Sequence, residues 1–142
     1  MAETTHETLV IHSRLAAVAE ARRWASDHVR AAGFDNDVVF AVELALSEAL
    51  TNVIEHAYAG DETQEIRLSL AIDDEKLRLT IRDFGRKFDL SSYQSPNLDV
   101  PAEGGYGVYL IHQLMDEVNY DTSPAQGTRL SLVKYRVGGT HA

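Results

Sequence analysis

The sequence predicts an α+β two-layer sandwich, in which a mostly antiparallel, mixed sheet carries its helices on one face. Three observations support this fold class. Two segments in the first half place apolar residues at the spacing of amphipathic helices. Two pairs of alternating strands are each joined by a short polar connection, as in hairpins. The resulting order, β-α-α-β-β-loop-α-β-β, has too few helices for the crossovers of a parallel sheet.

The first half of the chain contains three expected elements: a strand over 8–12, a helix over 14–32 and a helix from 36 to about 57. Ser13 is placed to cap the first helix, and Gly33 supplies the left-handed residue after its end. Asp35 or Asn36 caps the second helix. A turn at residues 60–61 closes this half.

The second half contains five expected elements: strands over 64–72 and 77–82, a helix over 108–115, and strands over 118–120 and 128–136. The first two strands alternate cleanly, so they form a hairpin with one buried face. Between residues 84 and 105 the apolar pattern is lost. Loops of that length are uncommon in compact domains and usually belong to binding sites or lids.

The composition limits the class of protein. The chain has 142 residues, which we read as one domain over 1–142, and it has no cysteine for disulfides or thiolate metal sites. Its formal net charge of −9 argues against direct nucleic-acid binding. The N-terminal residues lack a secretory signal, and no apolar run is long enough to span a membrane. We therefore expect a soluble, cytoplasmic protein.

One polar stripe stands out on the second expected helix. Glu48, Asn52 and His56 are spaced four apart and stack on one side of a helix that is otherwise rich in apolar residues. Asn52 falls between Ala41 and Ala45, at the margin of the face that should be buried. An amide there, one turn from a carboxylate, suggests a bound ligand.

Three glycine-containing motifs have both a functional and a structural interpretation. Asp83-Phe84-Gly85 follows a strand, so the carboxylate can point into a pocket, or the segment is an ordinary turn. The glycines of 104–107 open a helix and can expose N–H groups to phosphates, or they form a flexible joint. Gly127-Thr128 precedes the last strand, where the hydroxyl can support Asp83 or the pair is a hairpin turn.

Taken together and in order, these motifs resemble the ATP-binding fold of the GHKL superfamily, also called the Bergerat fold (gyrase, Hsp90, histidine kinase, MutL). Within it, the runs 43–52, 56–58 and 105–118 are similar to the anti-sigma factor serine/threonine kinases of the RsbW and SpoIIAB family. The resemblance extends from about residue 8 to residue 135.

The resemblance implies a role for each matched residue. Asn52 would be the Mg²⁺ ligand, and Glu48 would be the general base that prepares the attacking serine hydroxyl. Asp83 would accept the adenine amino group with support from Thr128, and Gly85 would make room for the ring.

The phosphates, by the same resemblance, would lie at the start of the third expected helix. Gly105 and Gly107 would cradle them, and the neighbouring Tyr106 and Val108 would belong to the same nucleotide-binding set. A lid drawn from residues 91–103 would close over them.

One position departs from the pattern of many relatives. Lys87 stands where the second glycine of Asp-x-Gly-x-Gly would be, although the run 85–89 is closer to a Gly-Arg-Pro-Phe-Asp variant of the family. We expect Lys87 to add a cation near the nucleotide and to narrow its pocket.

The function implied by the resemblance is an ATP- and Mg²⁺-dependent serine kinase that acts as an anti-sigma factor. Its partners would be a STAS-domain anti-sigma factor antagonist, which it phosphorylates on serine, and a sigma factor or other regulatory protein. Relatives often form homodimers. The alternative is a nucleotide-binding regulatory module that sequesters its partner without kinase activity. A detached histidine kinase domain is less favoured, because no helical hairpin with a phospho-accepting histidine precedes the fold.

Overall fold

The structure, a computed structural model, describes residues 4–88 and 106–136. Its elements are β1 (Thr5–His12), α1 (Leu15–Ala31), α2 (Asn36–Asn52), η1 (Val53–Ala57), β2 (Glu65–Ile72), β3 (Lys76–Arg82), α3 (Tyr106–Leu114), β4 (Glu117–Asp121) and β5 (Arg129–Tyr135). The expected order of strands and helices is confirmed, with one difference: the helix expected from 36 to about 57 ends as an α-helix at Asn52 and continues as the π-helix η1. The other boundaries shift by at most three residues.

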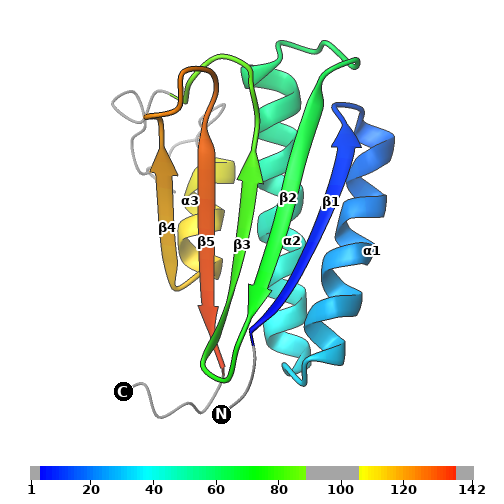
Figure 1. The fold of residues 1–142 in the computed structure, drawn as a ribbon, viewed down its shortest axis with the longest axis vertical. Helices are drawn as coiled ribbons and strands as arrows, with labels where there is room; N and C mark the ends of the chain where they lie inside the picture. The colour runs from blue at the N-terminus through cyan, green and yellow to red at the C-terminus, as the bar shows by residue number, and fades with distance from the viewer. Residues whose placement is uncertain (1–3, 89–105, 137–142) are drawn as a thin grey trace.

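The five strands form one sheet in the order β1-β2-β3-β5-β4. All four pairings in the described part of the chain are antiparallel, so the expectation of a mostly antiparallel sheet is confirmed. Figure 1 shows the three α-helices together on one face of this sheet, and none of the described helices lies on the other face. The fold is therefore a two-layer α+β sandwich, as expected.

The helix layer begins at defined caps. Asp35 accepts a hydrogen bond from the Val38 amide at 3.0 Å, so Asp35 rather than Asn36 caps α2. Gly33 ends the α1 region with a φ of +89°, which a residue with a Cβ rarely adopts. Ser13 does not cap α1. Its hydroxyl instead donates to the Asp61 carbonyl and accepts from the Gln64 amide, which fixes the turn before β2.

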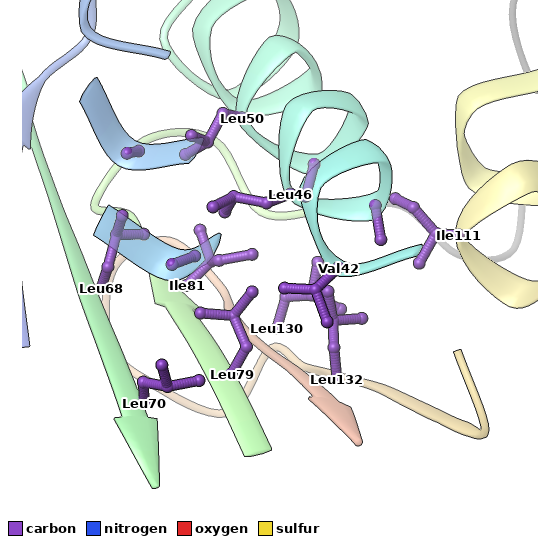
Figure 2. Close-up of a cluster of buried hydrophobic side chains, with 14 of the residues drawn as sticks. Val42, Leu46, Leu50, Leu68, Leu70, Leu79, Ile81, Ile111, Leu130 and Leu132 are labelled. Atoms are coloured by element: carbon purple, nitrogen blue, oxygen red, sulfur yellow. The ribbon is translucent and has the colours of Figure 1, made fainter. Parts of the chain in front are cut away.

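The core lies between the sheet and α2. The inward residues of the alternating strands pack against α2 and α3, as Figure 2 shows for Leu68, Leu79, Leu132, Leu46 and Ile111. These five side chains are each at most 2% exposed. Burying a leucine or isoleucine side chain stabilises a fold by about 1.5–3 kcal/mol, so this layer holds α2 rigidly over the central strands.

No helix in the described residues is long and apolar enough to cross a membrane.

Candidate functional site

The polar stripe of α2 meets the first turn of α3. A Cβ placed on Gly107 would lie 2.8 Å from Glu48 Oε2 and 3.6 Å from both terminal atoms of the Asn52 amide. Gly107 is therefore the residue that lets α3 approach the two side chains. Ala41 and Ala45 are buried on the same helix, as expected for a face that receives a close neighbour.

Glu48 and Asn52 are half-buried and have no hydrogen-bond or ion-pair partner among residues 4–88 and 106–136. Two polar groups held this close without partners are costly unless water or a ligand satisfies them. The structure thus brings together the two residues that the stripe singled out, and leaves their oxygen atoms available.

His56 does not continue the stripe. The helix changes at Val53–Ala57 to a π-helix, whose wider turn moves residue 56 away from the four-residue spacing. His56 is exposed, and its carbonyl accepts hydrogen bonds from the Arg86 guanidinium at 2.8 and 3.2 Å. The expectation of a single straight stripe is therefore wrong at its last member.

Asp83 directly follows β3 with its carboxylate turned inward, and only 4% of the residue is exposed. Asp83 Oδ1 accepts from the Gly85 amide at 3.0 Å. Burial raises the pKa of Asp83 above its usual 3.8, although hydrogen bonds from the backbone of Gly85 and Thr128 and the charge of Arg82 oppose that rise. A buried acid at the end of a strand is a strong acceptor for a ligand N–H group.

Gly127 and Thr128 bring β5 against this carboxylate. A Cβ on Gly127 would overlap the Asp83 carbonyl and lie 2.7 Å from the Phe84 Cα, and the glycine has a φ of +71°. The Thr128 carbonyl accepts from the Asp83 amide at 3.1 Å. Within the described residues, the Thr128 hydroxyl accepts from the Phe88 amide at 3.0 Å, so the backbone of Thr128 is what supports Asp83 here.

Gly85 packs against the end of the π-helix. A Cβ there would overlap the Ala57 carbonyl oxygen and lie 2.8 Å from a ring carbon of Tyr58. Tyr58 itself is buried, accepts from the Phe84 amide at 2.7 Å and donates to the Glu65 carbonyl at 2.5 Å. Sequence reasoning assigned no separate role to Tyr58. The sequence signal that could have indicated its role is a tyrosine two residues after His56, the last member of the stripe.

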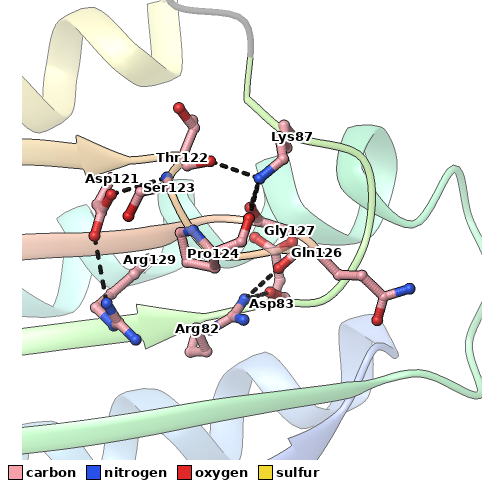
Figure 3. Close-up of polar contacts among 10 residues, drawn as sticks. All are labelled: Arg82, Asp83, Lys87, Asp121, Thr122, Ser123, Pro124, Gln126, Gly127 and Arg129. Atoms are coloured by element: carbon pink, nitrogen blue, oxygen red, sulfur yellow. Dashed lines mark hydrogen bonds and ion pairs between the residues drawn. The ribbon is translucent and has the colours of Figure 1, made fainter.

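Lys87 faces the connection between β4 and β5. Its ammonium donates to the carbonyl oxygens of Thr122 (2.5 Å), Pro124 and Gly127 (3.5 Å), as Figure 3 shows for the first two. Hydrogen bonds from Ser123 lower the pKa of Asp121, and the charges of Arg129 and Lys87 add to this effect. The next residue, Phe88, stacks on Tyr120 with ring centroids 4.0 Å apart.

Part of the predicted set lies outside the described residues. Gly105 and the proposed lid over 91–103 belong to the undescribed part, and for Tyr106 only the backbone is described, at the start of α3. Val108 is described and its side chain is 7% exposed, so it packs beneath the first turn of α3.

A pocket of about 400 Å³ opens beside Gly85. It shares only Gly85 with the predicted site residues and is lined by Ala57, Tyr58, Ala59, Asp61, Gln64, Phe84, Gly85 and Arg86. The predicted residues form a separate arrangement at the ends of β3, α2 and α3.

Residues 11–134 match the family model described as the histidine kinase-like ATPase domain. The chain belongs to the histidine kinase-like ATPase domain family. The match includes only the last two residues of β1, all of the elements from α1 to β4, and β5 except its last residue. Each residue of the arrangement above therefore falls inside it.

Similar proteins within this family carry the name serine-protein kinase RsbW. That of Staphylococcus epidermidis is 37% identical over 114 residues, covering 73% of this chain and 70% of its own length. Those of Bacillus licheniformis and Listeria monocytogenes are 33% and 32% identical, over 111 and 114 residues, covering 72% and 73% of this chain and 68% and 70% of their own lengths.

The fold also matches a crystal structure of the RsbU and RsbW domains of a Mycobacterium tuberculosis protein. The TM-score is 0.66 at 20% identity, and the match covers 92% of this chain and 32% of that chain. The likeness at this identity supports the fold.

The donors of the site fit a small hard cation as expected for a nucleotide-bound Mg²⁺. An amide oxygen and a carboxylate, both without other partners among the described residues, face the same glycine. The described part of the chain holds no cluster of three or more His, Cys, Asp or Glu residues for a metal. Mg²⁺ is usually held by one or two protein oxygens together with waters and phosphates.

Proposed function

We propose that this chain is a serine-protein kinase that uses ATP with Mg²⁺. The observation that carries the proposal is the pair Glu48 and Asn52, held against Gly107 without other partners in the described residues. The serine-protein kinase name of the similar RsbW proteins supports it.

The proposed arrangement of ATP follows from the positions of the side chains. The adenine amino group donates to Asp83, in the layer between sheet and helices, while the phosphates lie at the N-terminus of α3. Backbone N–H groups and the helix dipole favour an anion there. They supply the local positive potential that phosphates need on a chain with a net negative charge. Gly105, Tyr106, Gly107 and Val108 form this phosphate-facing turn in the proposal, and Thr128 supports Asp83 from β5.

Asn52 is the residue that would hold Mg²⁺, which when bound neutralises phosphate charge during transfer. Glu48 lies one helical turn before it and accepts the proton of the attacking serine hydroxyl. Lys87, whose ammonium contacts the carbonyls of the connection between β4 and β5, belongs to the same nucleotide-binding set in the proposal.

The proposed protein substrate is a serine of a STAS-domain anti-sigma factor antagonist. The second partner is a sigma factor or another regulatory protein, which the chain releases when the antagonist binds. We also propose a homodimer as the active form. These assignments rest on the family resemblance of the motifs.

The experiment is phosphoryl transfer from labelled ATP to a candidate STAS protein encoded nearby, with Mg²⁺ present. The expected result is label on serine that falls by about a hundredfold or more in Glu48→Gln, the range for loss of a general base. A matched control is Glu55→Gln, because this substitution removes the same charge from an exposed position on η1. ATP binding without transfer to any STAS protein would instead assign a nucleotide-binding regulatory module.

A further inference from the structure

The sheet face opposite the helices is basic, although the whole chain is acidic. The cross-strand register places Arg67 beside Arg82 and Arg82 beside Arg129, so three arginines form one row across β2, β3 and β5. Adjacent strands are about 4.8 Å apart, which brings the three side chains into one cluster. Figure 1 shows that the helices of the described part of the chain all lie on the opposite face.

A second row lies beside the first and is made of small polar residues. Ser69, Thr80 and Ser131 are register partners on the same three strands. Beyond them, Arg78 and Lys76 add two more cations from β3. In the described strands this face carries five cationic and three anionic side chains, the latter being Glu65, Glu117 and Asp121. The formal net charge of the whole chain is −9.

The arginines keep donors available for a ligand. Arg67 bonds Glu65 only through Nε, and Arg129 bonds Asp121 through one terminal nitrogen, while their side chains are 60% and 48% exposed. Arg78 is exposed and has no hydrogen-bond or ion-pair partner within residues 4–88 and 106–136. A guanidinium has five N–H donors and matches the two oxygens of a carboxylate.

The local geometry holds part of this row in place. The guanidinium carbons of Arg82 and Arg67 lie 4.2 and 5.0 Å from the ring centroid of Phe84. Arg82 also donates to the carbonyls of Asp83 and Gln126 (Figure 3). Ordered arginines lose less side-chain entropy when they bind an anion than freely rotating ones.

We propose that this outer face, defined by Arg67, Arg78, Arg82 and Arg129, docks a carboxylate-rich segment of a partner protein. Charge complementarity selects an acidic occupant. Because Ser69, Thr80 and Ser131 have small side chains, the backbone of the bound segment has room to approach the sheet. A nucleic acid fits less well. The cations span only three strands, and the aromatic rings at the face are already covered by Arg67, Arg82 and Lys76.

The proposal is independent of the proposed kinase activity, because the face lies on the opposite side of the sheet from the helix layer. The test uses the full chain, a fluorescein-labelled Glu-rich peptide and its Gln-substituted counterpart, at low salt. The variant is the triple substitution Arg67→Gln, Arg78→Gln and Arg129→Gln. The matched control removes the same charge from α1 and its N-terminus, through Arg14→Gln, Arg23→Gln and Arg30→Gln, all exposed.

We expect the Glu-rich peptide to bind and the Gln-rich peptide not to bind. The outer-face variant should lose about tenfold in affinity and the control less than about twofold, the range for three exposed charge pairs of modest strength. Amide NMR shifts on peptide addition should map to Ser69, Thr80 and Ser131. The melting temperature of each variant checks that it is folded.

Three results would overturn the proposal. Equal losses of peptide affinity in the two variants would show that binding depends only on the net charge of the chain. Tighter binding of single-stranded DNA than of the Glu-rich peptide would assign the face to nucleic acid. Self-association of the wild-type chain that the outer-face variant alone abolishes would assign it to contact between copies.

Discussion

Gly127 is the glycine at which a single added methyl group should disturb both the fold and the site. It has a φ of +71°, and a Cβ there would overlap the backbone carbonyl of Asp83 and approach the Phe84 Cα to 2.7 Å. These atoms cannot rotate away as a flexible side chain would. The substitution Gly127→Ala must therefore displace the end of β3, which carries the Asp83 carboxylate.

The magnitude follows from comparison with Gly60. Gly60 has a φ of +84° and nothing within 4 Å of an added Cβ, so Gly60→Ala measures the backbone strain alone. That strain is about 1–2 kcal/mol for a non-glycine residue in the left-handed region. Gly127→Ala adds the displacement of a packed backbone, about 1–3 kcal/mol more. We expect total losses of about 1–2 kcal/mol for Gly60→Ala and about 2–5 kcal/mol for Gly127→Ala.

The assay is urea unfolding of both variants and of the wild type, together with ATP titration of the folded proteins. Gly127→Ala should lower the unfolding midpoint more than Gly60→Ala, with a similar m value. It should also weaken ATP binding, whereas Gly60→Ala should not. Equal destabilisation by the two substitutions would refute the argument that Gly127 is needed for contact with Asp83.

Three further predictions concern neighbouring residues. Gly107→Ala should leave stability unchanged or raise it by up to about 1 kcal/mol, since alanine favours a helix. It should nevertheless reduce phosphoryl transfer, because the Cβ would lie 2.8 Å from Glu48 Oε2; melting curves and the kinase assay check this, and lost stability with full activity would contradict it. Asp83→Asn should stabilise the protein more at about pH 7 than at about pH 4, as urea unfolding at both pH values would measure. Because burial raises the pKa of Asp83 in the folded state, the protein loses stability as pH rises through this folded-state pKa. Asparagine does not ionise, so the substitution removes this loss. Lys87→Met should cost about 1–2 kcal/mol by urea unfolding, because three carbonyls lose a charged donor. The control Lys134→Met, which removes a partly exposed ion pair with Asp116, should cost about 0–1 kcal/mol, and equal losses would disprove the role of Lys87.

The strands and helices with a clear apolar period could be predicted from the sequence, because the pattern of buried side chains determines their type. The alternation in β2 and β3 and the helical spacing in α1 and α2 correspond to the faces that are buried. Asp35 as a cap and Gly33 as a left-handed residue are local signals that the structure also contains.

The turn at residues 53–57 could not be predicted in this way. The residue types in a π-helix do not distinguish it from an α-helix. Here the π-helix occurs where Gly85 packs against the Ala57 carbonyl and where Arg86 donates hydrogen bonds to the carbonyls of His56 and Ala57. His56 therefore looked like part of the stripe. Contacts between distant segments, such as Tyr58 with Phe84, decide its position, and a single sequence does not encode them as a pattern.

Lys87 shows the same limit at the site. Its place in the motif predicts a cation near the nucleotide, but the sequence does not show which backbone groups the ammonium contacts. The carbonyls that hold it come from residues 122–127, which are far away in the chain. The four-residue spacing places Glu48 and Asn52 on one side of α2, but the approach of Gly107 to both side chains comes from a distant segment.

The most direct test of the site is the affinity for ATP measured by calorimetry with and without Mg²⁺, in wild type and in Asn52→Ala. The wild type should bind ATP more tightly with Mg²⁺, and Asn52→Ala should lose about tenfold or more of that Mg²⁺-dependent gain, since one metal ligand is removed. Thr51→Ala, on the adjacent helix position, should keep it. An unchanged Mg²⁺ dependence in Asn52→Ala would contradict the assignment of Glu48, Asn52 and Gly107 as the phosphate end of the site.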